Sequence, residues 1–285
     1  KTTTGASNTA VGAFALCANT TAAENVAIGK QSMQATTTGA SNTAVGTQSL
    51  YTNTTGANNV AMGLGALFDN TSGNCNVAVG VSALENNTTA GNNTAVGMHA
   101  MLTNTVGFDN VAVGKSALCA LTDGDYNTAI GAGSMNKTTT GLRNTAVGNN
   151  SLICNTTGTG NTAVGGTDAG TLPVMWKNTT GVCNAAFGTG ALSCNTTGGC
   201  NTALGFRALC NLTTGNCNVA VGTDSGHQTS MVNFTTESNR GVFGHTDITN
   251  AYVKVAWTVT SDARDKINFE SVPHGLDFVN QLEPY

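Results

Sequence analysis

The feature that most constrains this chain is a seventeen-residue repeat. A segment written Asn-Thr-Ala-Val-Gly, or a close variant, begins thirteen times, and the steps between segments are all equal except for one longer step. In all thirteen units the Asn, the Ala two residues later and the Gly four residues later are unchanged. A disordered low-complexity tract has no reason to keep three residue columns in register, so the repeat predicts an ordered, repetitive fold. The segments begin at Asn8, Asn25, Asn42, Asn59, Asn76, Asn93, Asn110, Asn127, Asn144, Asn161, Asn184, Asn201 and Asn218.

Each unit predicts one coil of a solenoid. The pattern is typical of a short extended segment, a bend at the Gly, a second extended segment around a Leu, and a turn at Asn-Thr-Thr-Gly. At about 3.3 Å per extended residue, one unit can form a flattened loop with two walls but not a pair of helices. The predicted fold class is therefore all-β, a parallel β-roll or β-solenoid of 17-residue coils over residues 1–226. The structural columns include Asn42, Ala44, Gly46, Asn59, Ala61 and Gly63.

The interior of the coil is predicted from strand alternation. Side chains alternate along a strand, so Val45 lies on the same side as Thr43, and Leu50 is expected to meet them from the opposite wall. The small Ala and Gly columns are then expected to line the other face, where another backbone can approach closely. Burying a Val and a Leu contributes roughly 1.5–3 kcal/mol each, whereas ordering the backbone costs about 1–2 kcal/mol per residue. Neighbouring coils, and further chains, must therefore stabilise each unit.

Composition excludes several classes of partner. The chain is 40% hydrophobic but only 5% aromatic and 9% charged, so its core must be built from small side chains. A formal net charge of −4 gives no basic surface for phosphates, so nucleic acid is not an expected partner. The apolar runs are too short to cross a bilayer, so no membrane insertion is expected in this fragment. The opening Lys-Thr-Thr-Thr-Gly reads as part of a unit, which leaves a leader or anchor upstream open.

The longer step contains an insertion, residues 166–177. Insertions in solenoids usually form loops on one face, and such loops often bind partners. Leu172, Met175 and Trp176 are therefore the candidate receptor loop. The alternative is that Trp176 folds back over a coil edge or packs between chains.

The nine cysteines fall into two regions of the repeat. Cys75, Cys183, Cys200 and Cys217 directly precede the Asn column, and the last three should form a ladder because equal columns stack. Reduced thiols are expected for a protein assembled in a cytoplasm, with local disulfides such as Cys194–Cys200 or Cys210–Cys217 as the alternative. Three of the four histidines share no column with them, so neither a metal site nor a cofactor is predicted. Asn-Thr-Thr turns match the N-glycosylation pattern, but turn chemistry accounts for them without sugar.

The unit resembles known repeats. Asn-Thr-Ala-Val-Gly followed by Ala-Leu is similar to the head repeats of trimeric autotransporter adhesins and to related repeats of bacteriophage tail fibres. The resemblance covers about residues 8–222. It implies left-handed parallel β-rolls packed as a homotrimer around a threefold axis.

The C-terminal part changes character. Residues 227–260 are predicted to be a short β stem, since polar and apolar residues alternate there. The following segment, TSDARDKINFESVPHGLDFVNQLEPY, resembles the start of the endosialidase-type C-terminal intramolecular chaperone, an α-containing domain of which residues 261–285 hold only the beginning. That resemblance implies self-cleavage of the Thr260–Ser261 bond, with Ser261 as nucleophile and Lys266 as its activator. The alternative is that Ser261 only caps a helix.

These observations favour a structural protein over an enzyme, apart from single-turnover self-cleavage. The expected function is a trimeric tail fibre or spike of a phage or related virus, assembled in the host cytoplasm and attaching to a glycan or protein on the host surface. One alternative is a cellular surface adhesin or extracellular fibril. Another is part of a glycan-degrading tail spike whose catalytic domain lies outside this fragment.

Overall fold

The structure is a computed structural model that describes residues 4–167, 170–227 and 232–250. The chain divides into two units, Lys1–Asp247 and Ile248–Tyr285. The first unit holds all the strands found among the described residues and is described below by itself.

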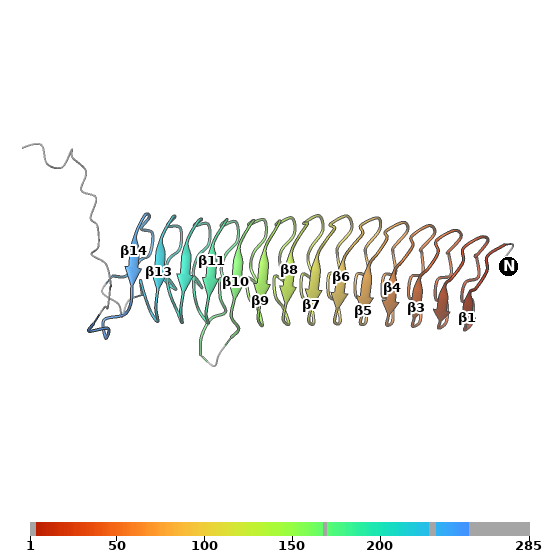
Figure 1. Ribbon diagram of the computed structural model, residues 1–285, viewed down its shortest axis with the longest axis horizontal. Coiled ribbons are helices and arrows are strands. Elements are labelled where there is room, and N and C mark those ends of the chain that lie inside the picture. Colours follow the sequence, from red (N-terminus) through yellow and green to blue (C-terminus); the bar gives the residue numbers. More distant parts are fainter. Residues whose placement is uncertain (1–3, 168–169, 228–231, 251–285) are drawn as a thin grey trace, which may run out of the picture. The chain divides into compact units, whose positions relative to one another are not determined.

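The first unit is a rod of parallel β-strands (Figure 1). Fourteen strands of three residues each form one sheet, and their order in the sheet is their order in the sequence. The described residues contain no α-helix. This confirms the predicted all-β parallel solenoid. The strands are β1 (Thr9–Val11), β2 (Val26–Ile28), β3 (Thr43–Val45), β4 (Val60–Met62), β5 (Val77–Val79), β6 (Thr94–Val96), β7 (Val111–Val113), β8 (Thr128–Ile130), β9 (Thr145–Val147), β10 (Thr162–Val164), β11 (Ala185–Phe187), β12 (Thr202–Leu204), β13 (Val219–Val221) and β14 (Gly241–Phe243).

The register between coils is constant. Ala44 of β3 pairs with Ala61 of β4, and the same relation holds along the repeat. The longer step of the repeat keeps this register, since Ala163 of β10 pairs with Ala186 of β11. At about 4.8 Å per strand, fourteen strands span roughly 60 Å.

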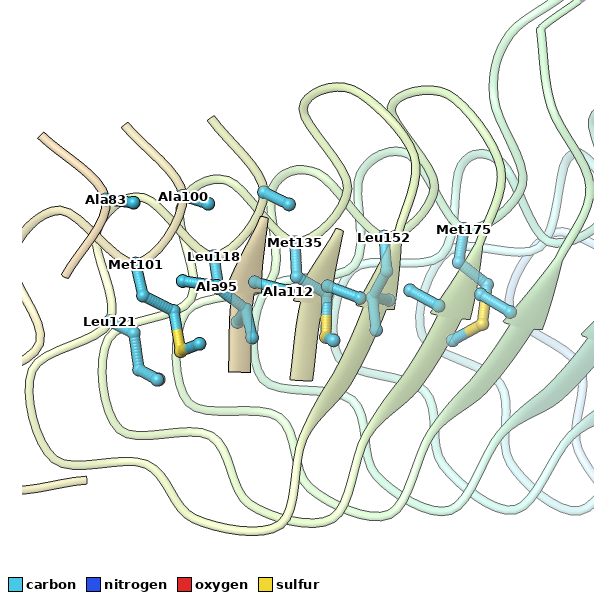
Figure 2. Packing of buried hydrophobic residues seen from close by; sticks show 14 of the residues in the cluster. Ala83, Ala95, Ala100, Met101, Ala112, Leu118, Leu121, Met135, Leu152 and Met175 are labelled. Carbon is cyan, nitrogen blue, oxygen red and sulfur yellow. The ribbon is translucent and has the colours of Figure 1, made fainter. Parts of the chain in front are cut away.

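The coil interior differs from the sequence prediction. The Ala of each strand from β2 to β13 is fully buried, and the Leu or Met of the opposite wall meets it there (Figure 2). The flanking strand residues, such as Thr43 and Val45, point outward and are only partly buried. The prediction that Ala44 and Ala61 line the outer face was therefore wrong. Strand alternation defines two faces but does not say which is inside, and a coil this narrow has room for only an Ala opposite a Leu.

The opposite wall is also not a strand. Leu50 has a left-handed φ of 49°, and Gln48 before it has a φ of 58°. This wall still bonds to the next coil, because Leu50 N–H donates to the Ala66 carbonyl at 2.9 Å and Thr52 N–H to that of Phe68 at 3.0 Å. The alternation of left-handed and ordinary residues compacts the wall, so that one repeat unit closes a loop around a single Leu.

The backbone conformation and close surroundings of the Gly column explain why no other residue type occupies it. Gly46 has a φ of 144°, which L-residues rarely adopt. A Cβ at Gly46 would also overlap the carbonyl group of Gly63 in the next coil. The backbone of the next coil thus approaches Gly46 and Gly63 closely, as the sequence predicts.

The Asn column forms a buried ladder of amides. Asn59 donates from its backbone N–H and from Nδ2 to Asn42 Oδ1, at 2.9 and 3.1 Å. Its Nδ2 also donates to the Gly73 carbonyl at 2.8 Å. The buried side-chain amide of each Asn is thus hydrogen-bonded within the interior, where a polar group without a partner would destabilise the fold.

A second ladder lies eleven residues after the first, at Asn53 and its equivalents. Asn70 Nδ2 donates to Asn53 Oδ1 at 3.0 Å. The ladder is interrupted where Leu121 takes the Asn position, and Asn104 Oδ1 in the preceding coil is buried without a hydrogen bond. It resumes at Asn155, whose Oδ1 accepts from Asn178 Nδ2 at 3.0 Å. Interruption of this ladder is therefore tolerated, whereas the first ladder has no interruption in thirteen units.

The sheet continues past the predicted end of the repeat domain. β14 pairs in parallel with β13, and Val242 takes the place of the buried Ala. This strand lies within residues 227–260, for which the sequence predicted a separate stem. The sequence pattern does not reveal this strand, because Arg240 replaces the Asn that marks a unit.

Candidate functional site

The predicted self-cleavage site lies outside the described residues. Ser261, Lys266 and the Thr260–Ser261 bond all belong to that part of the chain. Their roles stay predictions.

The insertion is shorter than the sequence indicates. Met175 is fully buried in the row of Leu and Met side chains, and its N–H donates to the Ala191 carbonyl at 2.9 Å (Figure 2). Val174 before it takes the small-residue position and is also fully buried. The repeat therefore resumes at Val174, and the extra residues lie between Gly165 and Val174. Met175 is a core residue and is not available for a receptor, while Trp176 is half-buried and Leu172 is exposed.

Beside the insertion lies a cavity of about 320 Å³. It is bounded by the insertion on one side and by the next three coils on the other. Its lining residues are Gly170, Thr171, Leu172, Gly190, Ser193, Cys194, Arg207, Cys210, Asn211 and His227. Leu172 is thus placed at a concave polar site, and Met175 is not.

Charged side chains meet at this cavity. Arg207 Nε lies 3.3 Å from Asp224 Oδ1, and Arg207 Nη2 lies 2.9 Å from His227 Nε2. His227 Nδ1 is 3.6 Å from the same Asp224 oxygen. Because a guanidinium can only donate, the facing histidine nitrogen accepts, which requires a neutral imidazole.

Burial shifts the pKa of two side chains that line the cavity, His227 and Cys210. Desolvation lowers the pKa of His227, the Arg207 charge lowers it further, and Asp224 acts in the opposite direction. Desolvation also raises the pKa of the Cys210 thiol to about 11. Cys210 is therefore a neutral thiol at physiological pH and a poor nucleophile. The cavity offers hydrogen-bond donors and a guanidinium, which suits binding a polar ligand rather than covalent chemistry.

Sequence reasoning missed this site, although a signal was present. Gly190, Arg207 and Asp224 occupy the same position in three consecutive units, two residues after the Gly column. Equal columns stack, so an Arg followed by an Asp there predicts an ion pair along the rod. His227 lies in the last unit, 17 residues after Cys210, so the same stacking argument places these two residues in one column.

The outward face of the sheet is the second candidate site. It consists of the first and third residue of each strand, which is Thr, Val or Ala at the first position and an apolar residue at the third in the thirteen units. None of these residues is charged. At the third position the most exposed are Val11, Ile28, Met62, Val113, Ile130, Phe187, Leu204 and, in β14, Phe243. Monomeric proteins rarely expose an uninterrupted apolar strip of this length.

The cysteines within the described coils are thiols. All nine are free, and five of them are exposed. Within the same coils, no three His, Cys, Asp or Glu residues are arranged to hold a metal ion.

Comparisons with models of known protein families, with curated proteins and with solved structures found no match. Among the residues that the structure describes, no helix is long and apolar enough to span a membrane.

Proposed function

We propose that this chain is a structural subunit of a homotrimeric attachment fibre of a phage or related virus. The observation that carries the proposal is the uncharged apolar face that follows the sheet from β1 to β14. A rod-shaped repeat with such a face is suited to bear load between a particle and a surface only when the face is covered.

Further copies of the chain are the occupant that fits this face best. The strip is straight and repeats every coil, so its natural complement has the same spacing. Burying the exposed part of one such side chain contributes on the order of 1 kcal/mol. Summed over the fourteen strands of one chain, this amounts to about 14 kcal/mol, which is at the upper end of the roughly 4–15 kcal/mol that association costs. Three copies that turn this face toward a common axis would cover it in all of them.

The cavity beside the insertion is the proposed contact with the host surface. Most of its lining side chains are polar, and exposed Leu172 is one of its lining residues. Half-buried Trp176 follows Leu172 by four residues in the sequence. A neutral glycan hydroxyl or a carboxylate could accept hydrogen bonds from Arg207. The proposed C-terminal chaperone would bring three chains together in register and then release itself before Ser261.

The decisive experiment is the native mass of the full chain. A trimer is expected, with a native mass three times the denatured mass of the chain, which is 28.6 kDa for these 285 residues and less if the segment from Ser261 is released. A native mass of one chain at micromolar concentration would overturn the proposed assembly. Binding of labelled trimer to host cells, and its loss when free surface polysaccharide is added, would then test attachment.

A further inference from the structure

Three exposed cysteines form a column on the rod. Cys183, Cys200 and Cys217 each directly precede the Asn column, in three consecutive coils. Each has a left-handed φ, at 55°, 57° and 57°. They therefore share one backbone conformation and one place on the coil.

The backbones that carry them are hydrogen-bonded to neighbouring coils. Cys200 N–H donates to the Val182 carbonyl at 2.9 Å, and Cys217 N–H donates to the Gly199 carbonyl at 3.0 Å. Coils in register are about 4.8 Å apart, so equivalent Cα atoms have about that separation. Disulfides join residues whose Cα atoms are about 4.4–6.8 Å apart. Neighbours in the column meet this condition, and residues two coils apart do not.

The side chains in this column also lie over one another. Gly160 holds the same position in the coil before Cys183, and a Cβ built there would lie 3.5 Å from Cys183 Sγ. A cysteine sulfur at this position thus reaches the side chain of the preceding coil. The same relation places Cys200 beside Cys183, and Cys217 beside Cys200.

We propose that these three cysteines are an oxidation site that forms one disulfide between adjacent coils. The central Cys200 takes part in either bond, with Cys183 or with Cys217, and the third cysteine remains a thiol. The inference rests on the register of the coils and is independent of the attachment function.

The oxidant is a small disulfide such as oxidised glutathione. One cysteine thiolate attacks a sulfur of the oxidant, which forms a mixed disulfide and releases one glutathione thiolate. The neighbouring cysteine thiolate then attacks the protein sulfur of that mixed disulfide and releases the second glutathione thiolate. Two protein thiols and one oxidised glutathione thus become one protein disulfide and two reduced glutathiones.

The test is peptide mapping of the full chain after incubation in a glutathione buffer, acid quenching and alkylation of the remaining thiols. Trypsin cleaves after Lys177, Arg207 and Arg240. A Cys200–Cys217 bond therefore joins two peptides, whereas a Cys183–Cys200 bond leaves one peptide lighter by two hydrogen atoms. The expected result is the loss of two thiols per chain from this column, within single chains at all protein concentrations.

Substitutions separate the proposal from nonspecific oxidation. Serine already stands at this position in other coils, at Ser7 and Ser41, so Cys→Ser is compatible with the fold. Cys200→Ser should abolish the bond, and Cys183→Ser should leave only Cys200–Cys217. Cys75 is the matched control, because it has Asn58 and Asn92 as column neighbours and should form no disulfide within the chain.

Three results would overturn the proposal. They are glutathione adducts on all three cysteines without a protein disulfide, a bond between Cys183 and Cys217 in the Cys200→Ser variant, and bonds formed only between chains.

Discussion

At the scale of single residues, two kinds of glycine stand side by side in the repeat. Gly63 belongs to the invariant column, with a φ of 135°, and a Cβ there would lie 2.5 Å from the Gly80 carbonyl oxygen. Gly65 has a φ of 64°, and the nearest atom to its Cβ would be Ser82 Oγ at 3.7 Å. The first position is restricted by space and by φ, the second by φ alone.

Alanine at these two positions should therefore destabilise the rod to very different extents. Gly65→Ala is expected to cost about 1 kcal/mol, the penalty of the left-handed conformation. Gly63→Ala should cost at least about 3 kcal/mol, because the backbone of the next coil must move. Urea midpoints of the two variants measure this difference, and equal midpoints would contradict it.

The two Asn ladders should also differ. Asn59→Leu removes the acceptor of the Asn76 backbone N–H and of Asn76 Nδ2, which now lie at 2.9 and 3.2 Å from Asn59 Oδ1. Leaving a buried donor unmatched costs about 1–3 kcal/mol, so a loss of roughly 2–4 kcal/mol is expected.

The control is Asn104→Leu in the second ladder. Asn104 Oδ1 already has no partner, and the substitution removes only the donor to Asn87 Oδ1 and the second donor to Gly107. A loss of about 1 kcal/mol is expected. Thermal unfolding of both variants measures the two losses of stability. A larger loss for Asn104→Leu would show that the first ladder is not the more important one.

At the scale of the secondary-structure elements, the sequence predicted the strands but not the wall that faces them. The invariant Asn, Ala and Gly columns locate every strand from β1 to β13, since the period and the turn residues can be read directly from the amino-acid sequence. The left-handed conformation of Leu50 is not visible, because Leu has no local preference for it. The closure of a short coil imposes that conformation. The same closure decides that Ala44 lies inside and Val45 outside.

The outward face of the sheet should fail as an interface when it carries charge. Val96→Lys in β6 puts an ammonium group on the uncharged strip without touching the interior. We expect the proposed trimer to dissociate while the far-UV circular dichroism spectrum stays unchanged. Thr47→Lys is the matched control, because Lys30 and Lys115 already occupy its position in other coils. A Val96→Lys chain that remains trimeric would exclude this face as the interface.

The coils around His227 should loosen on acidification. The folded state lowers the pKa of His227, so the unfolded state binds a proton at higher pH than the folded state does. The stabilisation is therefore present above the ordinary histidine pKa, about 6.5, and is lost as pH falls through and below it. Alkylation of buried Cys210 reports local opening.

The comparison is with His227→Gln, which keeps a polar side chain that does not titrate. At each pH the ratio of the wild-type to the variant alkylation rate removes the intrinsic pH dependence of the thiol. This ratio should rise between about pH 7.5 and pH 5. A constant ratio would mean that the pKa of His227 is the same in the folded and the opened state, and would contradict the lowered pKa.

At the scale of the whole molecule, the rod absorbs irregularities without losing its register. The longer step before β11 and the departure from the Asn pattern before β14 both leave the parallel pairing intact. Sequence periodicity detects the first because the pattern resumes, and misses the second because it does not. The cavity beside the insertion was missed for a related reason, since Leu172, Arg207 and His227 come together only when three coils are stacked.

The proposed release of the C-terminal domain is also tested on the whole chain. Ser261→Ala removes the proposed nucleophile and should yield a product of full denatured mass, whereas the parent chain should end at Thr260. Cleavage that persists in Ser261→Ala would assign the reaction to another group, and a parent chain that stays intact would remove self-cleavage from the proposed function.

The constant register from β1 to β14 makes the coil a unit of length. Because each coil offers its neighbours the same backbone and the same amide ladder, a gene can gain or lose the segment that encodes one repeat unit and still encode a continuous rod. Each such event moves everything carried at the far end by about 4.8 Å. Recombination between near-identical repeats could thus adjust the length of the rod in small, even increments without altering the surface it presents.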